Sequence, residues 1–286
     1  MKGGRYKGVQ YFNGGLFSTP AYVELTLEEV ELLREAAQFD WSKVRPEIFG
    51  TIFEHSLGKE ERHARGAHFT SAVDIMKVIG PTIIEPWTKE IESASTLGRL
   101  KQLLVRIENF TVLDPACGSG NFLYIAYREL KRLEAKIYEK MATEYKSVDP
   151  RQRPFGFLSS RNFFGIDINP FAVDIAKVTM MLAHKLSIDE LHINESALPL
   201  DNLDSNFRVG DALINNDGSK ADWVKTDTII GNPPFLGAKK LKPELGSDYV
   251  SLIRAAYPEV PGMSDFCVYW FRKAHDYLDN CTKDDV

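Results

Sequence analysis

Cysteine is scarce in this sequence, with three among 286 residues. Cys117, Cys267 and Cys281 are widely spaced and lack histidine partners at metal-ligand spacing, so they predict neither a disulfide framework nor a zinc site. Apolar runs of the ~18 residues that span a membrane are missing, and the first residues lack the apolar stretch of a signal peptide. We therefore expect a cytoplasmic protein with free thiols, no bound metal and no membrane partner.

The sequence also lacks an excess of positive charge, internal repeats and low-complexity segments. Its formal net charge is -5, and 44% of its residues are hydrophobic, which is ordinary for a globular protein. The acidic balance argues against a large phosphate-binding face but leaves room for a local basic cleft. The missing repeats exclude a fold that stacks short units, so we expect one large α/β domain or two smaller ones.

The N-terminal part of the chain predicts an irregular arm and then a helix. Residues 1–24 are rich in glycine and aromatic residues, which favours a loop. Thr26-Leu27-Glu28-Glu29 has the spacing of a capping box that starts a helix. Its apolar residues would share one face, and they are Leu27, Val30, Leu33 and Ala37.

Two further helices and a linker are predicted before the first strand. The second helix covers Pro46–Leu57, and the polar, basic stretch Gly58–Arg65 is the best place for a linker. The third helix begins near Ser71, where Ser71 and Asp74 can satisfy the first free N–H groups, and it continues through Ile79.

From residue 110 onward, short apolar runs alternate with long amphipathic stretches, a pattern typical of a parallel sheet covered on both faces. The predicted strands are Phe110–Leu113, Phe163–Ile168, Phe207–Val209 and Thr228–Ile230. The helices between them include one from Asn121 to about Met141 and one from Pro170 to about Leu186. In such a doubly wound, mostly parallel α/β fold, ligands bind where the strands end.

The first strand is followed by a glycine loop that runs from Asp114 to Phe122. Gly118 and Gly120 let the backbone approach a ligand closely, and the helix N-terminus offers unpaired N–H groups. A loop that only connects strand to helix is an equal alternative for a lone Gly-x-Gly. Because a third glycine is missing and Asp114 would repel a diphosphate, the loop favours a positively charged ligand such as S-adenosylmethionine.

Two further aspartates end the next strands. Asp167 could accept both hydroxyls of a ribose, although an aspartate that caps the helix starting at Pro170 is about as good an explanation. Asp211 could accept a hydrogen bond from an adenine amino group, but taken alone it is a turn aspartate.

The turn Asn232-Pro233-Pro234-Phe235 after the fourth strand is the most specific feature of the sequence. The two prolines fix the backbone and remove two donors, so Asn232 and Pro233 can present acceptor oxygens. Phe235 adds an aromatic face on which a planar group can stack. The combination suits an exocyclic amine on a flat ring.

The order of these motifs resembles that of the amino-methylating, S-adenosylmethionine-dependent DNA methyltransferases. Ala64–Thr70, before the glycine loop, resembles the remaining cofactor motif of the gamma arrangement, in which Thr70 would contact the methionine end. The resemblance is greatest to the MmeI-like, or type IIG, restriction-modification group. Tyr11–Phe17 and Ser264–Phe266 also resemble that group.

The resemblance implies methyl transfer to the exocyclic amine of an adenine that is flipped out of double-stranded DNA, in a restriction-modification or related defence system. The implied catalytic residues are Asn232, Pro233, Pro234 and Phe235. The implied cofactor residues are Thr70, Asp114, Pro115, Ala116, Gly118, Gly120, Asn121, Asp167, Ile168, Asp211 and Ala212.

The resemblance also divides the chain into two parts. It implies an N-terminal arm and helical segment over residues 1–62 and a Rossmann-like catalytic domain over residues 63–286. In this family further strands and a target-recognition domain follow, and a nuclease normally precedes. We therefore expect the catalytic domain to be incomplete at its C-terminus, with any fused nuclease and target-recognition domain outside this chain.

Three alternatives and one set of charges stay open. The same turn serves methylation of a protein glutamine or a ribosomal RNA base, and a non-catalytic DNA-binding subunit could retain the fold. A Rossmann dehydrogenase fits less well, because the glycine spacing is wrong and the double proline is unexplained. Lys239, Lys240 and Lys242 follow the turn, and Arg62 and Arg65 precede Thr70; they could contact phosphates or form a solvated face.

Overall fold

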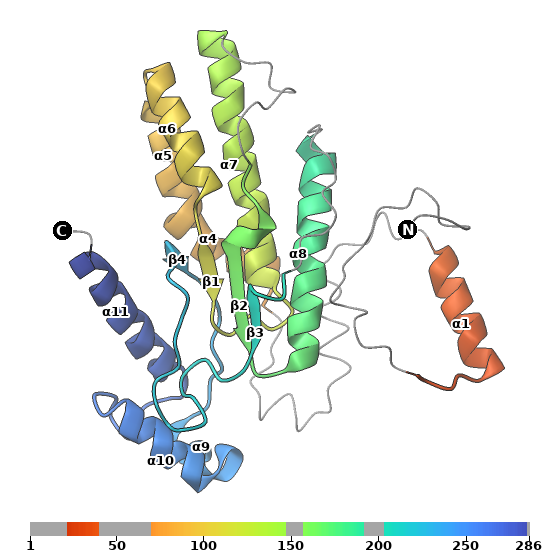
Figure 1. Ribbon diagram of the computed structural model, residues 1–286, viewed down its shortest axis with the longest axis vertical. Coiled ribbons are helices and arrows are strands. Elements are labelled where there is room, and N and C mark those ends of the chain that lie inside the picture. The colour runs from red at the N-terminus through yellow and green to blue at the C-terminus, as the bar shows by residue number, and fades with distance from the viewer. Residues whose placement is uncertain (1–21, 40–69, 147–156, 192–202, 285–286) are drawn as a thin grey trace.

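The computed structural model describes residues 22–39, 70–146, 157–191 and 203–284, with side chains up to Leu278. Its centre is a four-stranded parallel sheet in the order β3-β2-β1-β4 (Figure 1). The strands are β1 (Val112–Asp114), β2 (Phe163–Asp167), β3 (Phe207–Val209) and β4 (Thr228–Ile229). Each lies within two residues of its predicted bounds, and the α/β class is confirmed.

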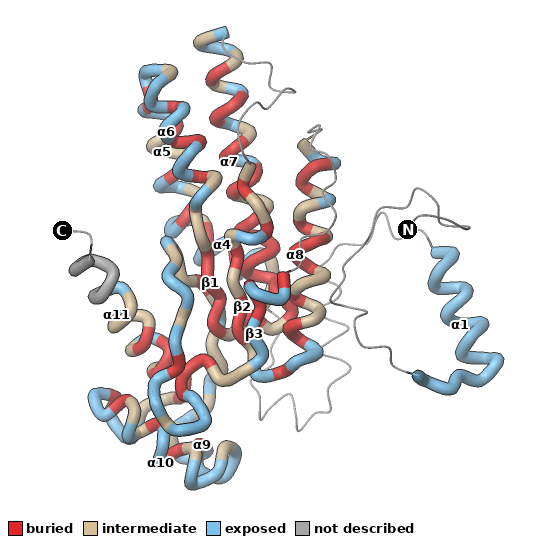
Figure 2. Tube along the Cα trace, viewed as in Figure 1, coloured by how far each residue is buried: buried red, intermediate tan, exposed pale blue. Residues whose placement is uncertain are grey.

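Neighbouring residues of one strand belong to different hydrophobic cores, one on each face of the sheet. Because both faces are buried, the strands are continuous apolar runs in the sequence. In β1, Val112 belongs to the first core and Leu113 to the second, and both are fully buried. In β2, Phe163 belongs to the first core and Ile166 to the second. Figure 2 shows this burial along β1 and β2. The sheet is therefore covered on both faces, as the sequence predicts.

The first core is formed with helices that precede β1 or connect the strands. They are α4 (Ala72–Ile79), the π-helical turn η2 (Gly80–Ile84), α5 (Glu85–Ser93), α6 (Leu97–Glu108), α7 (Asn121–Tyr145) and α8 (Pro170–Leu191), with a short 3-10 turn, η3 (Ser160–Asn162), before β2. Ser71 caps α4 by accepting from the N–H of Asp74 at 3.2 Å, which confirms the predicted start. Pro81 removes one helical donor, and the π turn between α4 and α5 accommodates this loss.

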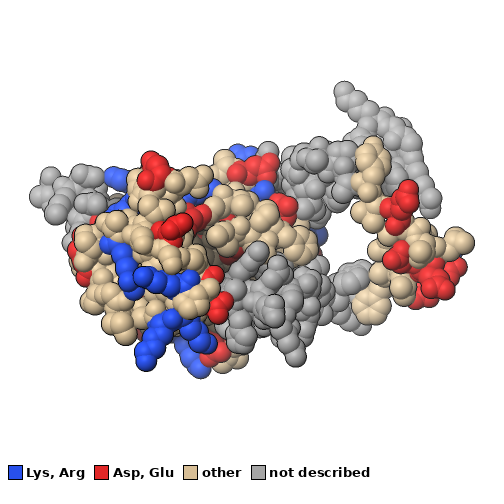
Figure 3. Space-filling view, turned by 90° about the horizontal axis from the view of Figure 1, so that it is seen from below, with Lys and Arg blue, Asp and Glu red and all other residues tan. Residues whose placement is uncertain are grey.

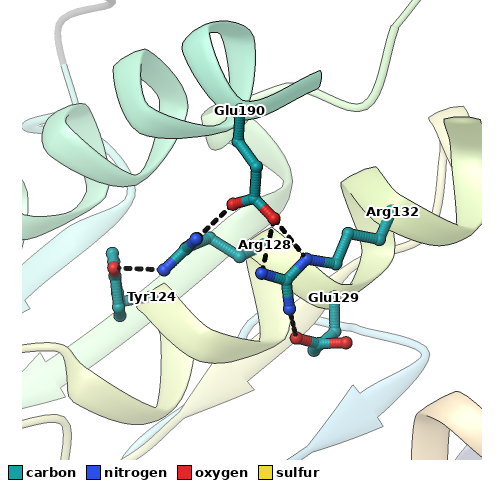
Figure 4. A network of polar contacts seen from close by, with 5 residues as sticks. All are labelled: Tyr124, Arg128, Glu129, Arg132 and Glu190. Atoms are coloured by element: carbon teal, nitrogen blue, oxygen red, sulfur yellow. Dashed lines mark hydrogen bonds and ion pairs between the residues drawn. The ribbon is translucent and has the colours of Figure 1, made fainter.

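Charged side chains join α7 to α8 next to this core (Figure 4). Glu190 of α8 accepts hydrogen bonds from both Arg128 and Arg132 of α7, with an Arg132 Nε–Glu190 Oε1 distance of 2.9 Å. Arg128 also donates to the Tyr124 hydroxyl at 2.8 Å. Burial raises the pKa of Glu190, but the two guanidinium groups outweigh it and the net pKa lies below its ordinary value. The network holds α7 against α8, the two helices that follow the loops after β1 and β2.

The second core lies between the other face of the sheet and the C-terminal helices α9 (Ala238–Leu245), α10 (Ser247–Ala256) and α11 (Cys267–Asp284). Leu241, Val250 and Trp270 are their buried anchors. These helices follow the Asn232–Phe235 turn, so the second core attaches everything after that turn to the sheet.

The helix α1 (Leu27–Gln38) forms with the predicted capping box: the N–H of Thr26 donates to Glu29 at 2.7 Å, and the N–H of Glu29 donates to the Thr26 hydroxyl at 3.3 Å. None of its residues is buried (Figure 2), so its apolar face packs on no described residue. The arm up to residue 21, the helix predicted at 46–57 and the linker at 58–65 lie outside the described residues. Among the described helices, none has the length and apolar composition of a membrane span.

Candidate active site

Four loops meet at the carboxyl-terminal edge of the sheet, because parallel strands all end at the same edge. They follow β1, β2, β3 and β4, at the lower ends of the strands in Figure 1. All predicted site residues except Thr70 lie at the ends of these strands, in the loops or directly after them. Thr70 lies directly before α4 and reaches the same edge through a contact described below.

The glycine loop after β1 adopts the conformation that its glycines permit. Gly118 and Gly120 have φ values of 51° and 83°, in the left-handed region that favours glycine. A Cβ at Gly120 would lie 3.1 Å from Ala176 of α8, so glycine also allows α8 to approach the loop. The N–H of Gly118 donates to Oδ2 of Asp167 at 2.9 Å, which ties the loops after β1 and β2 together.

Asp114 is a buried carboxyl under this loop, with only 1% of its surface exposed. Its Oδ1 accepts from the N–H of Ala116 at 3.0 Å, whereas its buried Oδ2 has no partner among the residues that the structure describes. Burial raises its pKa to about 7, the Ala116 N–H opposes this rise, and the charge of Asp167 adds to it. Within the described part of the chain, Oδ1 of Asn121, where α7 begins, is also buried without a partner. Two unsatisfied acceptors beside the glycine loop suit a ligand that carries positive charge.

Asp167 does not cap α8, so that alternative from the sequence is wrong. Its Oδ1 accepts from the N–H of Asn169 at 2.8 Å, and Asn169 in turn accepts from the N–H of Phe171 at 3.0 Å. Asn169 is therefore the residue that caps α8. The next residue of the loop, Ile168, exposes 63% of its side chain and offers an apolar surface at the strand end.

Asp211 is bonded on both oxygens. Its Oδ1 accepts from the N–H groups of Leu213 at 2.7 Å and Ile214 at 3.2 Å, as in a turn, and its Oδ2 accepts from the Tyr249 hydroxyl of α10 at 2.7 Å. Burial and the neighbouring Asp211 charge raise the pKa of Tyr249, so its hydroxyl stays protonated and donates. The turn interpretation of Asp211 is correct, and a second carboxylate lone pair on Oδ2 is left for another donor.

The loop after β4 packs directly on Asp114. Gly231 has a φ of 152°, and a Cβ there would lie 2.4 Å from Oδ1 of Asp114. The next residue, Asn232, is exposed, and its Nδ2 donates to Oγ1 of Thr70 at 3.1 Å. Among the described residues, no donor contacts Oδ1 of Asn232. Phe235 exposes 62% of its side chain, so the turn offers a free amide oxygen and an aromatic face.

Sequence reasoning missed the residues that hold these loops from the C-terminal helices. Asp265 accepts from the N–H of Leu236 at 3.1 Å and the N–H of Phe266 donates to the Leu236 carbonyl at 3.0 Å, so both anchor the segment after Phe235. Trp270 donates to the Pro115 carbonyl at 3.2 Å. The only signal was that Ser264–Phe266 belongs to the family resemblance, because no local spacing links these residues to their partners.

Comparisons with known proteins agree with this geometry. The family described as "MmeI, DNA-methyltransferase domain" matches residues 88–285. The solved structure of the type IIL restriction-modification enzyme MmeI in complex with DNA superposes with a TM-score of 0.77 at 27% identity, over 94% of this chain and 36% of that one.

Two relatives extend the comparison. DNA methyltransferase A of Bacillus subtilis (strain 168) is 32% identical over 281 residues, which are 93% of this chain and 30% of the relative. The adenine-specific methyltransferase PglX of Streptomyces coelicolor is 32% identical over 189 residues, which are 54% of this chain and 14% of the relative. The chain thus spans a third or less of these two relatives. By its sequence and its fold, the chain belongs to the MmeI DNA-methyltransferase domain family.

Proposed function

We propose that this chain transfers the methyl group of S-adenosylmethionine to the exocyclic amine of adenine in DNA, in the cytoplasm and as part of a restriction-modification or related defence system. One observation carries the proposal: Gly231, directly before the Asn232–Phe235 turn, packs on the buried carboxyl of Asp114, whose Oδ2 has no partner among the described residues. An acceptor turn for an amine and a buried carboxyl that suits a cation therefore share one edge of the sheet.

The cofactor would be held beside Asp114, by the loops that follow β1, β2 and β3. S-adenosylmethionine supplies an electrophilic methyl group on a positively charged sulfur, and it also carries an ammonium group. Asp114 and Asn121 offer acceptors that have no partner among the described residues, and the carboxylate of Asp167, at the end of β2, would accept from ribose hydroxyls. Ile168 would cover an apolar face of the adenine ring, and Asp211 with Ala212 would border its edge. The contacts of Pro115, Ala116, Gly118 and Gly120 keep the loop in the required shape.

The turn would act on the target amine. An aromatic amine is a poor nucleophile because its lone pair is delocalised into the ring. Oδ1 of Asn232 and the carbonyl of Pro233 would accept its two hydrogens, which favours a pyramidal nitrogen and stabilises the positive charge that develops on it. Pro234 keeps the turn rigid, and Phe235 would stack on the base after it leaves the duplex. No covalent enzyme intermediate is required.

The domain boundary belongs to the same proposal. We assign residues 63–286 to the catalytic domain and residues 1–62 to an N-terminal arm and helical segment, with any nuclease and target-recognition domain outside this chain. The bond between Thr70 and Asn232 supports including the segment before α4 in the catalytic domain.

The test is to find which macromolecule receives the methyl group. The protein expressed from its complete gene is incubated with methyl-labelled S-adenosylmethionine and with duplex DNA, ribosomal RNA or a cell protein extract. Label in DNA, recovered as N6-methyladenine, supports the proposal. Label confined to RNA or to protein overturns the substrate, and the absence of cofactor binding by calorimetry overturns the cofactor.

A further inference from the structure

Three exposed lysines follow the Asn232–Phe235 turn on one short helix. Lys239, Lys240 and Lys242 lie on α9, which begins three residues after Phe235. None of them has an ion-pair partner among the described residues. Several lysines elsewhere are paired with carboxylates, such as Lys136 with Glu92 at 2.9 Å and Lys185 with Asp189 at 2.6 Å. The α9 lysines therefore present positive charge that is not paired with a carboxylate of the described residues.

The position of α9 relative to the turn is fixed from three sides. Leu241, on its inner face, is buried in the second core. The segment between Phe235 and α9 is held at Leu236 by Asp265 and Phe266. The following helix, α10, is bonded to the loop after β3 through Tyr249. The lysine side chains can move, but their backbone keeps a set distance from Phe235.

The face of the molecule on which α9 lies carries side chains of both charges, but its positive charge is concentrated on α9. Figure 3, which views the lower end of Figure 1, shows two groups of Lys and Arg side chains on the left part of this face, with Asp and Glu side chains beside them. Glu244 and Asp248 are exposed near the end of α9 and the start of α10, so the excess comes from the first turns of α9. Because the whole chain has a net charge of -5, α9 attracts an anion locally, whereas the protein as a whole does not.

We propose that α9 is a phosphate-contacting element, in which Lys239, Lys240 and Lys242 bind the DNA backbone beside the adenine that stacks on Phe235. The inference rests on the proposed function and adds the surface that holds the strand. A nucleotide that leaves the duplex brings its own and its neighbouring phosphates toward the loop that receives the base. Lysines within seven residues of that loop are in reach of those phosphates, and such contacts position DNA without reading its sequence.

The test is the salt dependence of DNA binding. The protein from its complete gene is compared with a variant that carries Lys239→Gln, Lys240→Gln and Lys242→Gln, using a fluorescent duplex between about 50 and 200 mM NaCl. Each lost phosphate contact lowers the slope of log K against log salt by about 0.9, so a decrease of about 2 to 3 is expected. The Kd for S-adenosylmethionine should not change, because α9 contributes no residue to the cofactor pocket.

A matched control variant distinguishes the loss of charge on α9 from the loss of the same charge elsewhere on the protein. Lys89→Gln, Lys101→Gln and Lys146→Gln remove the same charge from α5, α6 and the end of α7, whose helices cover the opposite face of the sheet, and these lysines are likewise unpaired among the described residues. This control should keep the original slope. If both variants lower the slope equally, or neither does, the proposal is wrong while DNA methylation by the unchanged protein still supports the proposed function. If the unchanged protein neither binds nor methylates DNA, both fail.

Discussion

The side-chain amide of Asn232 donates a hydrogen bond to the hydroxyl of Thr70, 162 positions earlier in the chain, with an Nδ2–Oγ1 distance of 3.1 Å. The bond sets which end of the amide faces away from Thr70. Because the nitrogen is engaged, the oxygen is the end that can accept from a target amine. Thr70, which the family resemblance assigns to the cofactor, thus also contacts the Asn232–Phe235 turn.

We predict that Thr70→Val lowers kcat, because the isosteric side chain cannot accept from Asn232 and the amide loses its fixed orientation. The loss of one hydrogen bond of about 1 kcal/mol corresponds to about five- to tenfold in rate. Thr70→Ser, which retains the hydroxyl, should restore kcat. Steady-state kinetics and cofactor calorimetry check this together. A raised cofactor Kd with unchanged kcat would assign Thr70 to the cofactor alone.

A second prediction concerns Asp167 and the cofactor. Asp167→Ala should weaken S-adenosylmethionine binding by roughly 1–3 kcal/mol, because the ribose hydroxyls lose their acceptor and Gly118 loses its anchor. Asn169→Ala is the control, since it removes the cap of α8 two residues away. The control should lower thermal stability but leave the cofactor Kd nearly unchanged. Equal losses of affinity in both variants would mean that the effect of Asp167 is structural.

The sequence predicts those features that depend on neighbouring residues. The four strands are short apolar runs between loops, and the capping box of α1 needs only Thr26 and Glu29, so both are predicted correctly. The contact of Tyr249 with Asp211 joins residues 38 positions apart, and no spacing rule contains it. Asp167 is the only residue considered from the sequence as a cap of α8, whereas the structure assigns that role to Asn169, directly before Pro170.

A third prediction follows from the raised pKa of Asp114. In the folded protein this pKa is about 7, against an ordinary value of 3.8. The folded state therefore holds a proton that the unfolded state has lost, and the stability that this contributes disappears as pH rises from about 4 through 7. Asp114→Asn cannot titrate, so its stability relative to the unchanged protein should rise with pH over that window. Chemical denaturation at pH 5 and pH 8 measures the difference, and a constant difference would contradict the prediction.

The same carboxyl should couple cofactor binding to protons. A positively charged ligand favours ionised Asp114, so S-adenosylmethionine should bind more tightly at pH 8 than at pH 6 and release a proton near pH 7. Calorimetry in two buffers of different ionisation enthalpy counts the protons. Asp114→Asn should abolish the release and weaken binding. Proton release that persists in this variant would place the titrating group elsewhere.

A fourth prediction tests the contact between the two halves of the site. Gly231→Ala would put a Cβ 2.4 Å from Oδ1 of Asp114 at a φ of 152°, so the loop or the buried Asp114 side chain must move. We expect a loss of stability of about 1–3 kcal/mol and at least a roughly tenfold loss of methyl transfer, because Asn232 moves with its neighbour. Gly237→Ala, where a Cβ would meet nothing within 4 Å, should change neither. Similar effects from both variants would contradict the claim that the contact between Gly231 and Asp114 positions Asn232.

The most direct test measures N6-methyladenine in DNA by mass spectrometry after incubation with S-adenosylmethionine, for the protein from its complete gene and for its Asn232→Ala variant. We predict that the variant loses about 10²–10³-fold in methyl transfer. Its cofactor Kd should stay within a few-fold of that of the unchanged protein, because Asp114, Asp167 and Asp211 remain in place. Undiminished N6-methyladenine in the variant would contradict the assignment of Asn232, and no N6-methyladenine from the unchanged protein would contradict the proposed reaction itself.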